Sequence, residues 1–229
     1  MGDVQQPVIP LKVFMTWVTK EFPEPLKIRI DTLKKNNPEF EFIVYDDNDC
    51  RVFIHKHFSK SVLRAYDTLI PGAYKADLWR CCVLYIYGGI YMDIKLTTLP
   101  TFKLIYLTDK EYFVKDRPPN SIYNAFMVCK PRNVLLRHTI SAIIINVKTR
   151  FYGGCPLSPT GPMLMGMLAN KLGITTELYH LNSGEFIMHQ NTKIISIIFP
   201  EYDQIRQSVY RRKNTHRYHI LWANKQIYR

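Results

Sequence analysis

Apolar and polar positions follow two different periods along the first part of the chain. Residues 9–17 form an apolar, β-rich run that predicts a strand, and residues 40–45 alternate as a second strand. Between them, residues 23–35 repeat apolar side chains every three or four positions, which is typical of a helix. Because strands alternate with helices, the pattern predicts an α/β fold whose sheet contains parallel neighbours.

The stretch from Pro71 to Leu99 combines a long helix, a glycine turn and a strand. Pro71-Gly72 begins the helix, and no helix breaker follows before Gly88-Gly89. Residues 90–96 then alternate as a strand that carries Asp93. Asp77 and Arg80 are three positions apart, so they project from the same face of the helix.

Candidate site residues gather at one edge of the predicted sheet. Two predicted strands end at candidate residues, the first at Trp17 and the second just before the Asp46-Asp47 turn. A third predicted strand carries Asp93. Ligands of α/β sheets bind beyond the carboxyl ends of the strands. We therefore expect these side chains to share one binding edge.

The remaining elements are shorter or less regular. Asp46–Asp49 is expected to cap a helix that runs to about residue 58. The other predicted elements are a short helix toward residue 69, strands at 112–115 and 122–129, helices at 134–147 and 162–172, loops at 116–121 and 152–162, short strands within 177–199, and a basic tail.

The net charge of +12 indicates an anionic partner or a solvated basic face. Residues 201–229 carry seven Lys or Arg against two acids. Phosphates, an acidic glycan, an anionic membrane and nucleic acid are all compatible with such a surface. No known nucleic-acid-binding module is recognisable, so a nucleic-acid partner is not expected.

Cysteine usage and hydropathy indicate a protein of a reducing compartment. Five cysteines, an adjacent pair among them, form neither a disulfide framework nor a C-x-x-C zinc pattern. No apolar run approaches the roughly 20 residues that span a bilayer, and no secretory signal is visible. A cytoplasmic location is expected, with no transmembrane segment in this chain; a trimmed anchor is the alternative.

Three segments carry a family resemblance. The run A-D-L-x-R…L-Y-x-Y-G-G-I-Y-x-D, which ends at Asp93, resembles the donor-sugar segment of glycosyltransferase family 32. That family includes transferases of the capsular-polysaccharide and initiating-mannosyltransferase type. The resemblance continues in I-P-x-K-V-F-x-T-W (9–17) and N-P-E-F-E-F-I-V-Y-D-D-x-D (37–49), and it covers roughly the first 130 residues.

The resemblance implies a GT-A fold, in which a Rossmann-like mixed sheet is flanked by helices. It implies one domain over residues 1–229, with a nucleotide-sugar part to about residue 130 and an acceptor side with a closing segment from about 131 to 229. It also implies transfer of a hexose from a UDP- or GDP-linked sugar to a glycan or other hydroxyl acceptor, as in polysaccharide biosynthesis. Retention of the anomeric configuration is part of that expectation.

The resemblance also implies a Mn²⁺ or Mg²⁺ cofactor held by an Asp-x-Asp motif, but this chain reads Asp93-Ile94-Lys95. Asp93 is predicted to act in catalysis and to bind the metal. A charged lysine cannot ligate a metal, although Lys95 can meet a phosphate of the nucleotide directly; a solvated lysine is the alternative. Among the C-terminal histidines, His219 is preferred over His216 as a second metal ligand.

Other family positions match residues of the donor pocket. Asp77, Arg80 and Tyr91 resemble the residues that bind the donor sugar, although an intrahelical ion pair and a core tyrosine would explain them too. Trp17 and Asp47 resemble nucleotide-binding positions, with a core tryptophan and a helix cap as the alternatives. Asn124 resembles a residue that faces the transferred sugar and is predicted to act in catalysis.

Two other functions are compatible with the sequence. The missing second carboxylate would suit a non-catalytic relative that binds nucleotide-sugars. The positive charge would suit a polyanion-binding module built on the same scaffold. The residues leave the base, sugar, acceptor and oligomeric state open.

Overall fold

A mixed β-sheet forms the centre of the protein, whose computed structural model describes residues 7–181 and 183–229. Within these residues the sheet has nine strands in the order β2-β1-β3-β6-β5-β7-β8-β9-β4. β1 is parallel to β2 and β3, whereas β6 is antiparallel to β3 and β5. The strands are β1 Lys12–Thr16, β2 Glu41–Tyr45, β3 Gly89–Met92, β4 Thr97–Thr98, β5 Tyr112–Lys115, β6 Ile122–Cys129, β7 Leu178–His180, β8 Phe186–His189 and β9 Thr192–Ser196.

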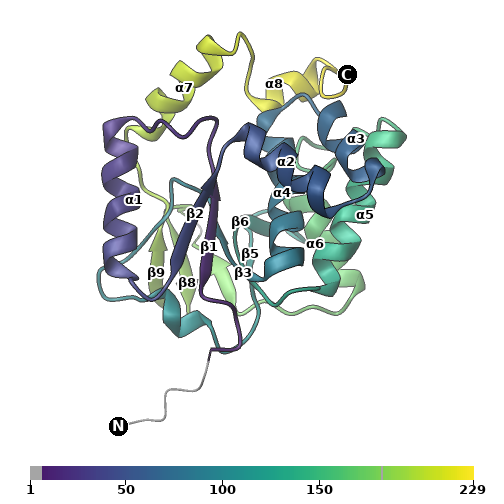
Figure 1. Ribbon diagram of the computed structural model, residues 1–229. Coiled ribbons are helices and arrows are strands. Elements are labelled where there is room, and N and C mark those ends of the chain that lie inside the picture. Colours follow the sequence, from purple (N-terminus) through teal and green to yellow (C-terminus); the bar gives the residue numbers. More distant parts are fainter. Residues whose placement is uncertain (1–6, 182) are drawn as a thin grey trace.

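Helices cover both faces of this sheet (Figure 1). In Figure 1, α1 lies on the left of the strands, α2 to α6 lie on the right, and α7 and α8 lie across the top. The helices are α1 Glu24–Asn36, α2 Asp47–His57, α3 Lys60–Thr68, α4 Gly72–Tyr87, the 3₁₀ helix η1 Leu104–Leu107, α5 Val134–Lys148, α6 Pro162–Lys171, α7 Tyr202–Arg212 and α8 Tyr218–Ala223.

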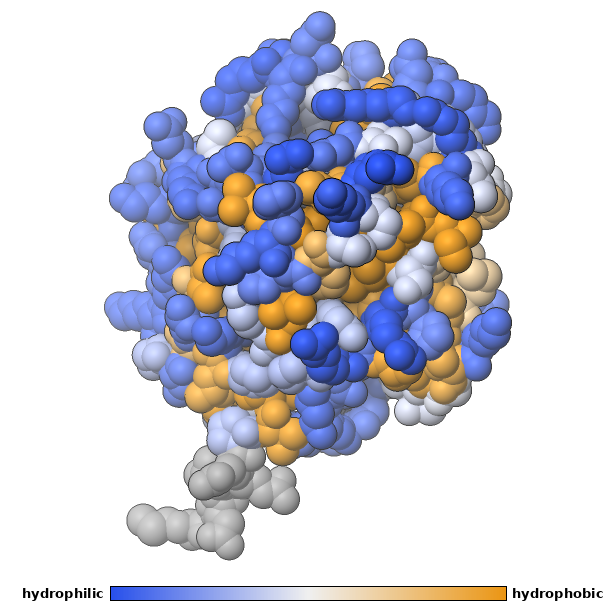
Figure 2. Space-filling model, turned by 45° about the vertical axis from the view of Figure 1, so that its right-hand side comes forward, coloured by the Kyte–Doolittle hydropathy of each residue, from blue (hydrophilic) through white to orange (hydrophobic). Residues whose placement is uncertain are grey.

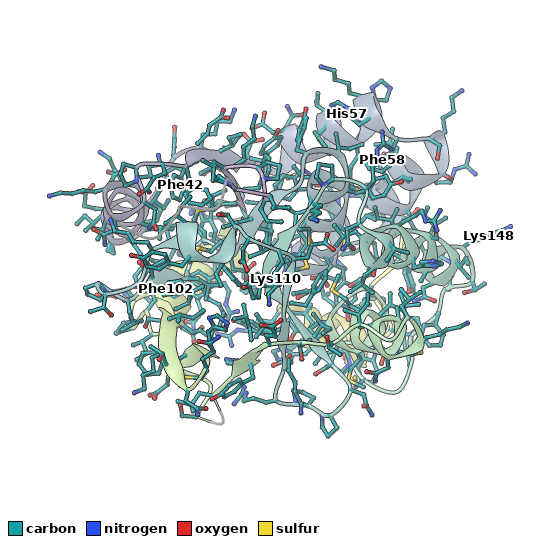
Figure 3. All side chains as sticks on the ribbon, turned by 90° about the horizontal axis from the view of Figure 1, so that it is seen from below. Phe42, His57, Phe58, Phe102, Lys110 and Lys148 are labelled. Carbon is teal, nitrogen blue, oxygen red and sulfur yellow. The ribbon has the colours of Figure 1, made fainter. Side chains whose placement is uncertain are left out.

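Strand alternation divides the core into one apolar cluster on each face. On β3, Tyr91 packs with the cluster beneath α2 to α6, whereas its neighbours Ile90 and Met92 pack with the cluster on the α1 side. Phe58 packs against the first cluster and Phe42 against the second, and Figure 3 shows them on opposite sides of the molecule. Tyr91 therefore faces α4, the helix that carries the predicted sugar-binding pair.

The predicted elements are confirmed through α6, with one shortened strand, and the structure adds β4 and η1 between β3 and β5. The strand expected over 90–96 ends at Met92. The amide of Asp93 still donates to the carbonyl of Ala125 on β6, but Leu96 N then donates to Asp93 O and closes a turn. The chain thus leaves the sheet at Asp93. The direction of the Asp93 side chain is therefore no longer set by the alternation of side chains along the strand.

The basic tail folds into two helices that the sequence analysis did not predict. In α7, Ile205 and Val209 are one turn apart and buried, while Arg211 and Arg212 in the last turn are exposed. In α8 the buried residue is Leu221. These helices lie above the end of the sheet at which the parallel strands terminate (Figure 1).

The glycine pair links α4 directly to β3. Gly88 and Gly89 have φ values of +64° and +97°, a region that residues with a Cβ rarely adopt. A Cβ on Gly89 would lie 2.6 Å from the carbonyl oxygen of Lys12 on the neighbouring strand. The glycines therefore allow the end of α4 to enter the sheet beside β1 without a longer loop.

Four of the five cysteines are buried. All five cysteines are free, and Cys81, Cys82 and Cys129 are fully buried. Within residues 7–181 and 183–229, no helix is both long and apolar enough to cross a bilayer.

Candidate active site

A pocket of about 710 Å³ opens beyond the carboxyl ends of β1 and β3. Its walls come from α4, β6, α7 and α8 as well as from the strand ends. Eight of the nine predicted site residues line it, namely Trp17, Asp47, Asp77, Arg80, Tyr91, Asp93, Lys95 and Asn124. His219 does not. Figure 2 shows mainly hydrophilic side chains over the top of the molecule, where α7 and α8 lie in Figure 1.

Asp77 is a buried, hydrogen-bonded carboxylate that lines the pocket. One carboxylate oxygen, Oδ1, accepts from Asn124 Nδ2 at 2.9 Å, and Oδ2 accepts from Thr160 Oγ1 at 2.8 Å. Only 11% of its side chain is exposed. Burial raises the pKa of this carboxyl, although the charge of Arg80 and these two hydrogen bonds oppose the rise. Each oxygen has a second lone pair with which it can accept from a ligand hydroxyl.

Arg80 joins α4 to β6 and to the end of β3. Its Nη1 donates to the backbone oxygen of Asn124 at 2.8 Å and to Asn124 Oδ1 at 3.2 Å. Its Nη2 lies 3.6 Å from Asp77 Oδ1 and 3.4 Å from Asp93 Oδ1. One guanidinium thus bridges two carboxylates, and this is more than the intrahelical pair that spacing alone predicts.

Asp93 stands at the mouth of this network. Its Oδ1 accepts from the hydroxyl of Tyr91 at 2.7 Å, and 26% of its side chain is exposed. The guanidinium of Arg80 lies 4.5 Å from the centre of the Tyr91 ring. Tyr91 is therefore both a core residue and the residue that orients the Asp93 carboxylate.

Lys95 and helix α7 form the neighbouring wall. The ammonium of Lys95 lies 5.8 Å from the centre of the Tyr202 ring, and the guanidinium carbon of Arg206 lies 5.4 Å from the same ring. Burial lowers the pKa of Lys95 and the charge of Arg206 adds to this effect, while Asp93 opposes it. In the part of the chain that the structure describes, no hydrogen bond or ion pair of the Lys95 ammonium occurs.

Trp17 and Asp47 also line the pocket. Trp17 is only 8% exposed, follows directly on β1, and packs its ring 6.2 Å from that of Tyr202. Asp46, not Asp47, is the N-cap of α2 and accepts from the amide of Asp49. Asp47 instead pairs with Lys213 from the segment after α7. Its carboxylate is therefore free of the capping role that the sequence left open.

Part of the chain that builds this pocket is similar to a described protein family. Residues 23–114 match the family described as a glycosyltransferase sugar-binding region containing a DXD motif. This stretch runs from α1 through the Asp77–Arg80 helix and Asp93 to β5. The similarity to that family is confined to residues 23–114.

Curated relatives match the same region. Inositol phosphoceramide mannosyltransferase 2 of Schizosaccharomyces pombe is 35% identical over 95 residues, which are 41% of this chain and 27% of the relative. The initiation-specific α-1,6-mannosyltransferase of Candida albicans is 30% identical over 91 residues, 37% of this chain and 24% of the relative. The matched part is thus about a quarter of the length of these relatives.

A solved structure shares the architecture. The chain named PaToxG glycosyltransferase superposes with a TM-score of 0.55 and 20% identity, over 72% of this chain and 69% of that one. The chain therefore has the GT-A fold, a mixed sheet flanked by helices, as the sequence predicted.

The sugar-binding region does not present a good metal site. The second carboxylate of the DXD motif is replaced by Lys95, and Oδ1 of Asp93 already meets Tyr91 and Arg80. His219 is exposed on α8, where Tyr218, one position earlier, takes the side that lines the pocket. Outside the masked positions, no group of three or more His, Cys, Asp or Glu side chains converges for a metal. Mn²⁺ and Mg²⁺ prefer several oxygen ligands, so the residues present do not fit the expected cofactor.

Several lining residues were not found by sequence reasoning. The ring of Tyr123 on β6 lies 4.4 Å from that of His180 on β7, at a tilt of 33°. His180 Nδ1 lies 3.1 Å from Asp116 Oδ1. Tyr202 and Arg206 come from α7. No local motif in the sequence indicates these residues. Strand pairing brings Tyr123 and His180 to the pocket, and the packing of α7 brings Tyr202 and Arg206. The buried pair Ile205 and Val209 was the one signal that could have indicated α7.

Proposed function

We propose that this chain is a glycosyltransferase that moves a hexose from a nucleotide-diphosphate sugar to a glycan or other hydroxyl acceptor. One observation carries the proposal. Asp77, Arg80, Asn124 and Asp93 converge on one pocket at the strand ends, and three of the four lie within the stretch that matches the sugar-binding family.

The convergent polar groups suit a sugar. Hydroxyls both donate and accept hydrogen bonds, and the pocket offers carboxylate acceptors beside guanidinium and amide donors. Asp77 would accept from one sugar hydroxyl, while Arg80 would donate to another. Asp93, which is more exposed, would accept from the donor where the sugar meets the diphosphate. The network of hydrogen bonds fixes these groups before the sugar arrives, which reduces the entropy lost on binding.

The nucleotide would bind against Trp17 and Asp47 in this pocket. The indole face can stack on a base, and the carboxylate can accept from the base or the ribose. Because matched relatives are named mannosyltransferases, mannose is the first hexose to test, with GDP and UDP as carriers.

We propose that the reaction retains the anomeric configuration. Both oxygens of Asp77 are already hydrogen-bonded, and Asp93 Oδ1 is held by Tyr91 and Arg80, so neither is presented as a free nucleophile. Retention is the outcome that the family resemblance implies, and without a free nucleophile a front-face transfer fits retention better than a double displacement. The bond between the anomeric carbon and the leaving phosphate breaks, the acceptor oxygen bonds to that carbon on the same face, and the acceptor proton passes to the leaving phosphate.

A donor-hydrolysis assay tests the proposal. The purified chain is incubated with GDP-mannose, UDP-glucose and related donors, and the release of GDP or UDP is followed by chromatography. Release that Asp93→Asn abolishes without lowering the melting temperature would support the proposal. Binding of nucleotide-sugars without any hydrolysis or transfer would support the non-catalytic relative instead. Salt-sensitive binding of nucleic acid alone would support the polyanion-binding module.

A further inference from the structure

We propose that Lys95, Arg206 and the hydroxyl of Tyr123 bind the diphosphate of the donor, so that the protein neutralises the leaving group without a divalent cation. This inference rests on the proposed function, which it deepens. It concerns how the pocket holds a nucleoside diphosphate, the group shared by every donor considered above.

The first support is the position of Lys95. It is two residues after Asp93, where the family motif has its second carboxylate. Asp93 and Lys95 line the same pocket. A lysine there supplies a positive charge and three hydrogen-bond donors at the place where a metal ligand would otherwise stand.

The second support is a set of polar groups without partners. Within residues 7–181 and 183–229, Nε of Arg206 and the hydroxyl of Tyr123 are buried and make no hydrogen bond. Buried donors are satisfied in the great majority of cases. Arg206 shares the Tyr202 ring with Lys95, and all four residues line one pocket. An anion between them would supply the missing acceptors.

The third support is the balance of charge in the pocket. Seven lining residues are Lys or Arg and four are Asp. Arg80 already forms ion pairs with Asp77 and Asp93, and Lys213 forms one with Asp47. Arg206 bonds the exposed Asp203 through Nη2, which leaves Nε for a ligand. The surplus of three positive charges is of the size that a bound diphosphate carries.

Helix α7 positions the guanidinium of Arg206 at the pocket. Arg206 and Tyr202 belong to α7, which buries Ile205 and Val209 against the core. The guanidinium is thus held over the pocket by packing that does not involve a ligand. Such preorganised charge stabilises a leaving group without reorganisation during the reaction.

Calorimetric titrations of the whole chain test the inference. GDP, UDP, their monophosphates and inorganic pyrophosphate are each titrated in EDTA and in MnCl₂. We expect the wild-type chain to bind at least one nucleoside diphosphate in EDTA, with little gain from Mn²⁺. Stronger binding of the nucleoside diphosphate than of free pyrophosphate would identify the nucleotide as the source of the anion.

Matched variants give the inference its specific readout. Lys95→Met and Arg206→Met should each weaken diphosphate binding in EDTA about tenfold or more, since each removes a charge-assisted hydrogen bond. The monophosphates should lose less. Lys148→Met is the control, because Lys148 is an exposed residue at the end of α5, at the edge of the molecule in Figure 3. It should change the dissociation constant less than about twofold, as a distant screened charge does.

A charge reversal separates this inference from the usual metal arrangement. Lys95→Asp rebuilds the Asp-x-Asp pattern, so it should lose binding in EDTA and recover part of it in MnCl₂. Wild-type binding that disappears in EDTA and returns with Mn²⁺ would overturn the inference while leaving the proposed function intact. Absence of nucleotide binding in both buffers would overturn both. Thermal unfolding of each variant shows whether a weaker affinity reflects a lost contact or a lost fold.

Discussion

Replacement of Arg80 by methionine is the most direct test of the buried network. The side chain of Arg80 is 7% exposed and that of its partner Asp77 is 11% exposed. Removing one member of a buried ion pair leaves the other charge unpaired and typically costs about 3–5 kcal/mol. Thr160 and Asn124 still donate to Asp77, so we expect a loss at the lower end, about 3 kcal/mol.

The pH dependence of this loss has a definite sign. Burial raises the pKa of Asp77 above its value in the unfolded chain, while Arg80 opposes the rise. The folded state therefore binds more protons than the unfolded state between the two values, and stability falls as pH rises through that interval. Without Arg80 the interval between the pKa of Asp77 in the unfolded chain and its pKa in the folded chain widens, because Arg80 no longer opposes the rise. The destabilisation by Arg80→Met should thus be larger near about pH 8 than near about pH 5.

Urea unfolding of three variants and the wild-type chain provides the measurement. Arg51→Met is the control, because Arg51 makes a comparable pair with Asp67 at 2.8 Å on the surface, where such pairs contribute little. The double variant Arg80→Met with Asp77→Asn should be less destabilised than the single variant, since it removes the stranded charge. A loss below about 1 kcal/mol for Arg80→Met, the range of surface pairs, would refute the reasoning.

Three further predictions follow from single positions. Asp93→Asn should reduce donor hydrolysis by at least about tenfold at an unchanged melting temperature, because it removes the charge beside the reacting bond; normal turnover would exclude the role. Trp17→Ala should weaken nucleotide binding by about 1–3 kcal/mol, measured by calorimetry, and equal affinity would exclude base stacking. Gly89→Ala should destabilise by at least about 2 kcal/mol because of its φ and the close Lys12 carbonyl, whereas Gly173→Ala, with φ of +67° and open space, should lose less in the same urea experiment.

The sequence predicted the fold through α6 because local signals there agree with the tertiary structure. Hydrophobic period, proline and glycine boundaries and caps all indicate the same elements, as at Pro71-Gly72 and Gly88-Gly89. The strand after Gly89 was predicted too long, since the alternation continues to Leu96 although the turn at Asp93 ends the pairing. Helix α7 was missed because its buried stripe is narrow and its exposed surface basic.

The candidate site was predictable where its residues share a short motif or match a position of the resembled family. Asp77, Arg80 and Asp93 lie within one helix–turn–strand unit, so their convergence follows from local geometry. Arg206 and Tyr123 reach the pocket through long-range pairing, which no spacing in the sequence specifies. His219 shows the converse: its neighbour Tyr218 lines the pocket, and one step of about 100° around a helix directs His219 elsewhere.

The polar groups of the pocket fall into two classes that substitution can tell apart. Asp77, Arg80 and Asn124 satisfy one another and hold α4 against β6, so the fold needs them whether or not a ligand binds. The Lys95 ammonium and Nε of Arg206 have no hydrogen-bond partner among the described residues, so they add no hydrogen bond to the folded chain. Burial of unpaired donors is unfavourable, and Lys95→Met should therefore leave stability unchanged or raise it. Greater stability together with weaker diphosphate binding would identify these donors as retained for the ligand.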